Sequence, residues 1–226
     1  MPSRTDVFYN DGIYHIFDKT IDNIPIFSSD KIANEFIRTF LFYRSVKLPY
    51  RFSNFKDLDM KTKKIKWEEI MKREYFKVEI LSYCLMPNHY HLLIKQVKED
   101  GIKTFMANIL NSITRYYNIF NERKGPVFLT QFKSNQIKSE EQLVYVSRYI
   151  HTNPFASSLT DIKGIFSYPF SSIDVFLEEG NNKNRIYTDS ILNYFKNNRK
   201  KYANFILKNA EDQKMRHWVK YIDKFI

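Results

Sequence analysis

Two apolar segments separated only by a Pro-Asn pair constrain the fold of this chain more than any other feature of its sequence. Residues 75–86 are apolar and rich in residues that favour strands, and residues 89–96 continue the apolar pattern after the pair. Pro87 and Asn88 are typical turn residues. The pattern therefore predicts an antiparallel β-hairpin whose first strand is mostly buried.

Apolar side chains with helical spacing predict helices on both sides of this hairpin. The pattern is clearest at residues 102–120, where apolar positions recur at i, i+3, i+4 and i+7. An earlier helix is expected from Asp30 to about residue 46. A later helix begins after Ser139, where Gln142 completes a capping-box signature, and is expected to end at Pro154.

Short strands at residues 13–19 and 135–138 complete the set of predicted elements. Their order is strand, helix, strand, strand, helix, strand, helix, which is the split β-α-β arrangement of a ferredoxin-like α+β fold with an antiparallel sheet. The basic stretch 44–73 is interpreted as an irregular surface excursion with a short helix near residues 67–71. We predict one main domain at residues 1–176 and a basic helical C-terminal extension at residues 177–226.

Composition indicates which partners the chain can meet. The 226 residues carry a formal net charge of +11, and the sequence pI is about 9.5. Such a charge is typical of proteins that bind nucleic acid, although solubility alone and an anionic membrane surface are alternatives. The sequence contains no run of about 18 apolar residues, so no segment is expected to span a bilayer. The N-terminus lacks a signal-peptide core, and the lone Cys84 cannot form an internal disulfide, so we expect a cytoplasmic protein.

Two histidines and a helical tyrosine are the candidates for chemistry. His89 and His91 alternate on a predicted strand and share one face, with Cβ atoms about 7 Å apart. Tyr149 and Asn153 lie one turn apart on one face of the last predicted helix. Imidazole and amide ligands without thiolate suit Mg²⁺ or Mn²⁺ better than a closed structural Zn²⁺ site. The plain alternative is a pair of ordinary strand histidines.

Four other residues are weaker candidates for chemistry. Tyr145 lies on the same helix but two turns from Asn153, so Tyr149 is preferred. His15 alternates on the first strand, which favours a hydrogen-bonded structural role. His151 falls on a different helical face from Tyr149 and is expected to be exposed. His217 in the tail has no partner at a useful spacing.

Two segments of the chain carry a family resemblance. Residues 83–93, YCLMPNHYHLL, resemble the metal-binding motif of HUH transposases, in which two histidines flank a bulky residue. Residues 149–154, YIHTNP, resemble the tyrosine motif of the REP-associated tyrosine transposase branch. Segments 117–121 and 125–132 are similar to the linking region of that family, and Ser171-Ser172 fits its continuation. The chain is therefore identified as a member of this single-tyrosine family.

The resemblance implies a complete set of functional assignments. Tyr149 is the nucleophile that forms a 5′-phosphotyrosine link to single-stranded or hairpin DNA, and the cofactor is Mg²⁺ or Mn²⁺. His89 and His91 are metal ligands, with Asn153 as the third. The domain at residues 1–176 is then the HUH catalytic domain, in a monomer or a homodimer.

Three basic residues are assigned as DNA contacts: Lys19, Arg115 and Arg148. Family members often carry an Asn-Arg-Gly-like sequence after the first strand, where this chain has Asp18-Lys19-Thr20. The resemblance implies that this segment helps to bind DNA, so we expect a different DNA target.

Two other functions are compatible with the residues. A ferredoxin-like sheet with aromatic and basic side chains can bind single-stranded nucleic acid without catalysis. Alternatively, the His-x-His pair could belong to a nucleotide phosphohydrolase. The histidine-triad hydrolases need a third alternating histidine, however, and position 93 is Leu.

Overall fold

A computed structural model describes residues 7–180 and 186–215 of the chain. Its core elements follow the predicted order: β1 (Ile13–Lys19), α1 (Asp30–Tyr43), β2 (Val78–Met86), β3 (His89–Gln96), α4 (Gly101–Phe120), β4 (Lys133–Ile137) and α5 (Glu140–Ala156). Short 3-10 turns lie at Ile21–Asn23, Ile26–Ser28, Arg73–Tyr75, Gly164–Ser167 and Asn193–Phe195. The predicted hairpin is confirmed, with Met86 paired to His89 beside the Pro-Asn turn.

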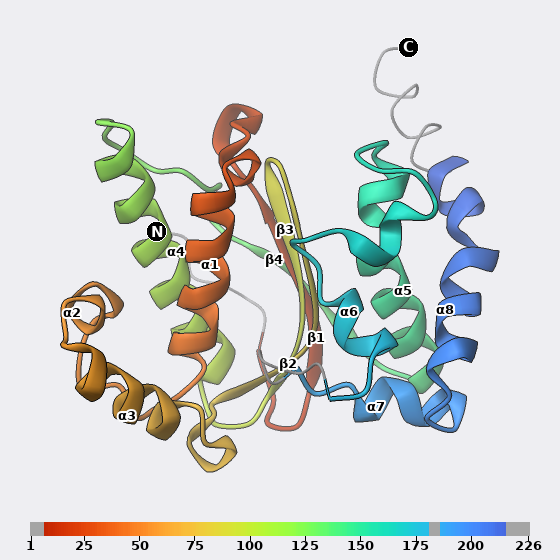
Figure 1. Ribbon diagram of the computed structural model, residues 1–226, viewed down its shortest axis with the longest axis horizontal. Helices are drawn as coiled ribbons and strands as arrows, with labels where there is room; N and C mark the ends of the chain where they lie inside the picture. Colours follow the sequence, from red (N-terminus) through yellow and green to blue (C-terminus); the bar gives the residue numbers. More distant parts are fainter. Residues whose placement is uncertain (1–6, 181–185, 216–226) are drawn as a thin grey trace.

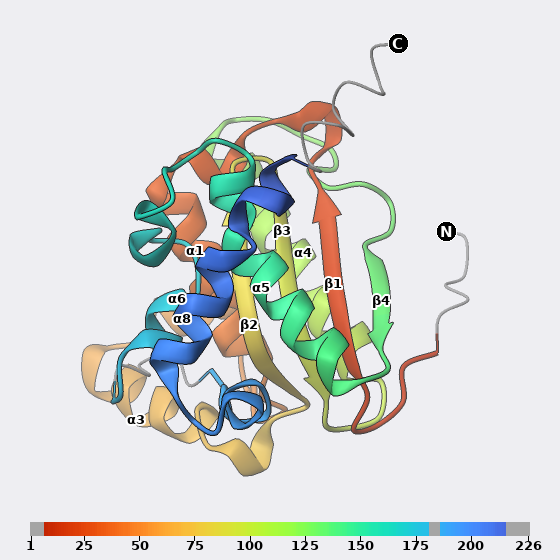
Figure 2. The ribbon, with the colours of Figure 1, turned by 90° about the vertical axis from the view of Figure 1, so that its right-hand side faces the viewer.

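The four strands form one antiparallel sheet in the order β2-β3-β1-β4. This order and the two intervening helices confirm the ferredoxin-like fold. Figure 1 shows the sheet edge-on between two helical layers, with α1 and α4 on one side and α5 on the other. Figure 2 shows α5 lying across the sheet.

Side chains of alternating strand residues divide between the two layers. Tyr90 and Tyr83 face α1, where their rings lie 5.2 Å from Phe36 and 5.0 Å from Phe40, respectively. The apolar stripe of α4 is buried on the same side from Ile102 to Ile113, as its helical spacing predicted, whereas Phe120 at the predicted end of the stripe is 49 % exposed. The opposite face of the sheet is therefore available to the histidines and α5.

The stretch 44–73 is more regular than its composition indicated. It contains two helices, α2 (Phe52–Lys56) and α3 (Met60–Ile70), so the interpretation as irregular was wrong. Most of the stretch is nevertheless on the surface, and α3 includes most of the short helix predicted near residues 67–71. Arg44 is fully buried, and its guanidinium lies 4.2 Å from the centre of the Phe76 ring. Stacking on an aromatic face allows a charged residue to enter the interior, which a count of charges does not reveal.

Pro154 does not end α5, contrary to the prediction. The helix continues to Ala156 because Phe155 and Ala156 are buried against the rest of the protein. The backbone N–H of Ser157 donates to the carbonyl of Asn153 at 2.9 Å, so the last turn keeps a bond beyond the proline. Packing thus outweighs the local cost of a proline within a helix.

Within the described residues, the basic tail contains helices, as predicted. After α6 (Ile173–Leu177), the chain forms α7 (Asp189–Leu192) and α8 (Arg199–Lys208). Figure 2 shows α8 alongside α5. His217 lies outside the described residues. In residues 7–180 and 186–215, no helix is long and apolar enough to cross a membrane.

Candidate active site

The paired histidines lie on the sheet face that α5 covers. His89 and His91 point to the same side of β3, and their ring centroids are 5.2 Å apart. In the register with β1, His89 is opposite Lys19 and His91 is opposite Phe17. The geometry therefore brings together the two residues that the alternation predicted to converge.

Each histidine is oriented by a hydrogen bond through Nδ1. In His91, this atom lies 2.9 Å from Nε2 of His15, and in His89 it lies 2.7 Å from Oδ1 of Asn88. Such partners fix the tautomer and the ring orientation of metal-binding histidines. With Nδ1 engaged, Nε2 is the nitrogen through which each ring would coordinate a cation.

Burial keeps His15 and His91 uncharged. It lowers the pKa of His15 to about 4. It also lowers the pKa of His91 well below its ordinary value, and the nearby His15, His89 and Lys19 act in the same direction. Both rings are consequently neutral near pH 7, which is the form that binds metal ions.

Tyr149 lies against His15 and His91 within the same chain. Its ring centroid is 5.5 Å from that of His91 and 5.9 Å from that of His15, in edge-to-face arrangements. The residue is nevertheless 40 % exposed, so one side of the phenol meets solvent. Burial of the remainder raises the pKa of the phenol, while a side-chain hydrogen bond from Asn153 opposes that shift.

Asn153 is buried one turn after the tyrosine. Its Nδ2 donates to the carbonyl of Tyr149 at 2.9 Å, so the amide oxygen is the atom it would offer to a cation. Two imidazole nitrogens and an amide oxygen are a donor set for a divalent cation whose remaining positions substrate oxygens would complete. The described ranges contain no group of three or more His, Cys, Asp or Glu side chains that could hold a metal ion.

The three predicted DNA contacts lie in different places. Lys19 is exposed beside the histidines. Arg148 is half-buried and stacks over the rings of Tyr145 and Phe205, at 4.7 and 5.0 Å, respectively. Arg115 is exposed on α4, on the other side of the sheet from α5. The structure thus brings only Lys19 to the histidine pair.

His151 was predicted to be exposed, and this prediction was wrong. It is fully buried, with Nδ1 at 2.7 Å from the Tyr202 hydroxyl and Nε2 at 2.9 Å from Ser172 Oγ. The Tyr202 hydroxyl also lies 2.6 Å from Ser147 Oγ. Helical spacing places His151 away from Tyr149 but cannot show that the tail covers that face of α5.

Gln213 is a second tail residue that the sequence did not single out. Its Nε2 donates to the carbonyl of Tyr149 at 3.1 Å, and its Oε1 accepts from the Thr152 hydroxyl. The tail therefore holds the tyrosine-bearing helix at two points, through Tyr202 and Gln213. No local spacing connects residues that lie this far apart in the chain.

The antiparallel sheet with paired histidines beneath a tyrosine-bearing helix is the arrangement that the resemblance to HUH single-tyrosine transposases implies. A family model described as "Transposase IS200 like" matches residues 41–153, which include His89, His91, Tyr149 and Asn153. The chain belongs to this IS200-like transposase family.

The fold is also similar to a solved structure described as a REP-associated tyrosine transposase bound to a REP hairpin. The TM-score is 0.54 and the sequence identity 12%, and the match covers 84% of this chain and 93% of the other. No curated protein gives a significant match.

Proposed function

We propose that this protein cleaves and rejoins single-stranded DNA through a covalent 5′-phosphotyrosine intermediate on Tyr149. The observation that carries the proposal is the position of the Tyr149 ring, which lies against His91 while remaining open to solvent on one side. We expect a substrate phosphate to approach the phenol from its exposed side. Family membership supports the same reaction class.

In the proposed step, the phenol oxygen of Tyr149 forms a bond to phosphorus. The bond from phosphorus to the 3′ oxygen breaks, that oxygen leaves as a hydroxyl after gaining a proton, and the phenol loses its own proton. A second 3′-hydroxyl reverses the step on another strand end, without an external energy source, because the phosphodiester energy is kept in the intermediate.

Ionisation of the phenol is the main energetic obstacle. A tyrosine with an ordinary pKa near 10 needs about 4 kcal/mol to ionise at pH 7. Burial raises the pKa of Tyr149 further, so the phenol remains protonated until substrate binds. A divalent cation supplies Lewis-acid stabilisation of the charge that develops on the phosphate. We assign its binding to His89, His91 and Asn153.

A folded single strand is the proposed substrate. The similar solved structure is described as bound to a REP hairpin, and the net charge of +11 favours a polyanion. Lys19 is placed beside the histidines and is suited to contact a phosphate near the cleavage point. We therefore expect hairpin or repeat sequences as targets, and all of the cleavage machinery within one chain.

The test is incubation with end-labelled hairpin DNA from beside the gene, in the presence of Mn²⁺ or EDTA. Wild type and Tyr149→Phe are compared with Tyr145→Phe. The last variant removes the hydroxyl of a half-exposed tyrosine on the same helix and controls for loss of a tyrosine hydroxyl. We expect a denaturation-resistant adduct in wild type and Tyr145→Phe, with Mn²⁺ only.

Each other outcome has a definite meaning. An adduct that persists in Tyr149→Phe would remove the nucleophile assignment. Cleavage that is indifferent to EDTA would remove the metal assignment. Salt-sensitive binding without any adduct would favour the non-catalytic binding module.

A further inference from the structure

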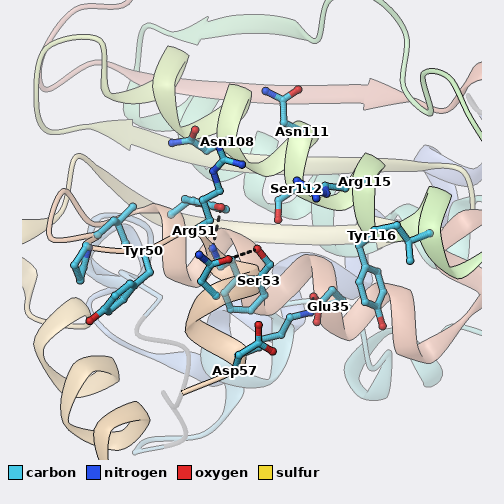
Figure 3. Close-up of a pocket in the computed structure, with 17 residues that line it drawn as sticks. Glu35, Tyr50, Arg51, Ser53, Asp57, Asn108, Asn111, Ser112, Arg115 and Tyr116 are labelled. Carbon is cyan, nitrogen blue, oxygen red and sulfur yellow. Dashed lines mark hydrogen bonds and ion pairs between the residues drawn. The ribbon is translucent and has the colours of Figure 1, made fainter. Parts of the chain in front are cut away.

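A groove lined by both polar and apolar side chains runs along α4, on the other side of the sheet from α5 (Figure 3 shows its main part). Its main part is a cleft of about 1140 Å³ between α4 and residues 48–57. A second cleft of about 660 Å³ continues it and shares Asn111, Arg115 and Ile119. We call these two adjoining clefts the α4 groove.

One wall of the groove is a polar stripe of α4. Asn108, Asn111, Ser112 and Arg115 follow the spacing i, i+3, i+4 and i+7, so they share one face of the helix over about 10 Å. All four line the main cleft, and Figure 3 shows Ser112 on the side of the helix towards the opposite segment and Asn111 on the side away from it. Asparagine amides supply hydrogen-bond donors and acceptors together, which matches the edges of nucleobases.

Arginines enter the groove from both walls. Arg51, from the segment opposite α4, and Arg115 are both exposed, and neither guanidinium has a hydrogen-bond or ion-pair partner among the described residues. Glu35 also lines the cleft, but it is paired with Lys56. Cations outnumber acids along both clefts. The basic lining residues are Arg51, Lys56, Arg115, Arg123 and Lys124, and the acidic ones are Glu35, Asp57 and Glu122.

The shape of the groove favours a single strand. It exceeds the roughly 300–1,000 Å³ typical of small-molecule pockets. Asn108 and Ser112 of its polar stripe are half-buried in the cleft between α4 and residues 48–57, whereas an element that reads duplex DNA must protrude into a major groove about 12 Å wide. A basic groove with an accessible aromatic ring is typical of single-strand binding, and Tyr50 at the rim is 39 % exposed.

We propose that the α4 groove binds a single-stranded stretch of nucleic acid that flanks the hairpin. Arg51 and Arg115 contact its phosphates, while Asn108 and Asn111 contact base edges. The identity of the ligand as flanking DNA rests on the proposed function. The groove would then hold the strand at a second position, separate from the one where Tyr149 cuts it.

The experiment measures binding without cleavage, using Tyr149→Phe protein in EDTA. Its probes are a labelled hairpin with a long single-stranded flank and the same hairpin without the flank. The test variant is Arg51→Gln with Arg115→Gln. Its charge-matched control is Lys200→Gln with Lys201→Gln, which changes two exposed residues of α8 in the other helical layer.

We expect the arginine variant to weaken binding of the flanked probe about tenfold at physiological salt, and to reduce the salt-dependence slope by about 1.4 for two lost phosphate contacts. The unflanked probe should bind unchanged. Asn111→Asp, a nearly isosteric change in the wall shared by both clefts, should also weaken only the flanked probe.

Three results would overturn the proposal. They are equal losses on both probes, equal losses in the lysine control, and no change in the arginine variant. Adduct formation by the protein with Tyr149 intact is scored separately. Failure of the proposed function therefore appears as a missing adduct, whereas failure of the groove assignment appears as unchanged binding of the flank.

Discussion

Removal of a single hydroxyl at Tyr202 tests how the tail supports the tyrosine-bearing helix. Tyr202→Phe keeps the ring, which is buried and stacked on Phe176 at a centroid distance of 4.8 Å. It leaves Nδ1 of His151 without its 2.7 Å partner in the interior. A buried polar group that loses its hydrogen bond typically costs about 1–3 kcal/mol.

Loss of the hydrogen bond between Tyr202 and Ser147 adds less to the expected cost in stability. The hydroxyl of Ser147 can turn to the carbonyl one helical turn before it. We therefore expect a loss of about 2 kcal/mol in the free energy of unfolding. For a chain of this length, that loss lowers the melting temperature by about 4–8 °C.

The assay is thermal unfolding followed by circular dichroism, with Tyr194→Phe as the control. Tyr194 is 45 % exposed, and its hydroxyl has no hydrogen-bond partner among the described residues. We expect the control to melt like wild type. If the two variants melt together, the buried hydrogen bonds of Tyr202 do not stabilise the packing of α8 on α5.

Three further predictions concern the metal, pH and backbone packing. His15→Ala should weaken the apparent Mn²⁺ affinity about 10–100-fold in adduct assays, because it removes the partner of His91 Nδ1; unchanged affinity would contradict this role. Burial lowers the pKa of His15 to about 4 and that of His151 to about 3, so the unfolded chain binds more protons below pH 6.5. Stability should therefore fall between pH 6.5 and 4, by up to about 1.4 kcal/mol per pH unit for each histidine, and His15→Gln should show a shallower fall in chemical denaturation. Gly101→Ala would press its new methyl group against the carbonyl oxygen of Lys77 and should lower the free energy of unfolding by about 1–3 kcal/mol; an unchanged denaturation midpoint would show that the backbone relaxes.

Periodicity in the sequence was sufficient for the elements of the ferredoxin-like core and their order. The apolar pair around Pro87 and Asn88 predicted the hairpin, and the stripe from Ile102 predicted α4. These signals are strong because strands and long amphipathic helices must repeat their buried positions at fixed intervals. The alternation of His89 and His91 likewise determined that both rings share one face of the sheet.

Local rules failed where distant parts of the chain provide the decisive contact. Pro154 remains inside α5 because the residues after it are buried. Arg44 is interior because its guanidinium stacks on the Phe76 ring. His151 is buried because Tyr202 and Ser172 reach it from other elements. Each outcome depends on a partner whose position the local sequence does not specify.

The sequence by itself determined which residues are available for chemistry, and the tertiary structure decided which of them meet. Spacing left open whether Tyr149 and the histidines meet within one chain, and the packing of α5 on the sheet places them together there. It also left Arg51 and Arg115 unrelated, until α4 and the segment opposite it enclosed one groove. Periodicity is a local property of the chain, whereas a site is formed by contacts between elements, and only packing creates those contacts.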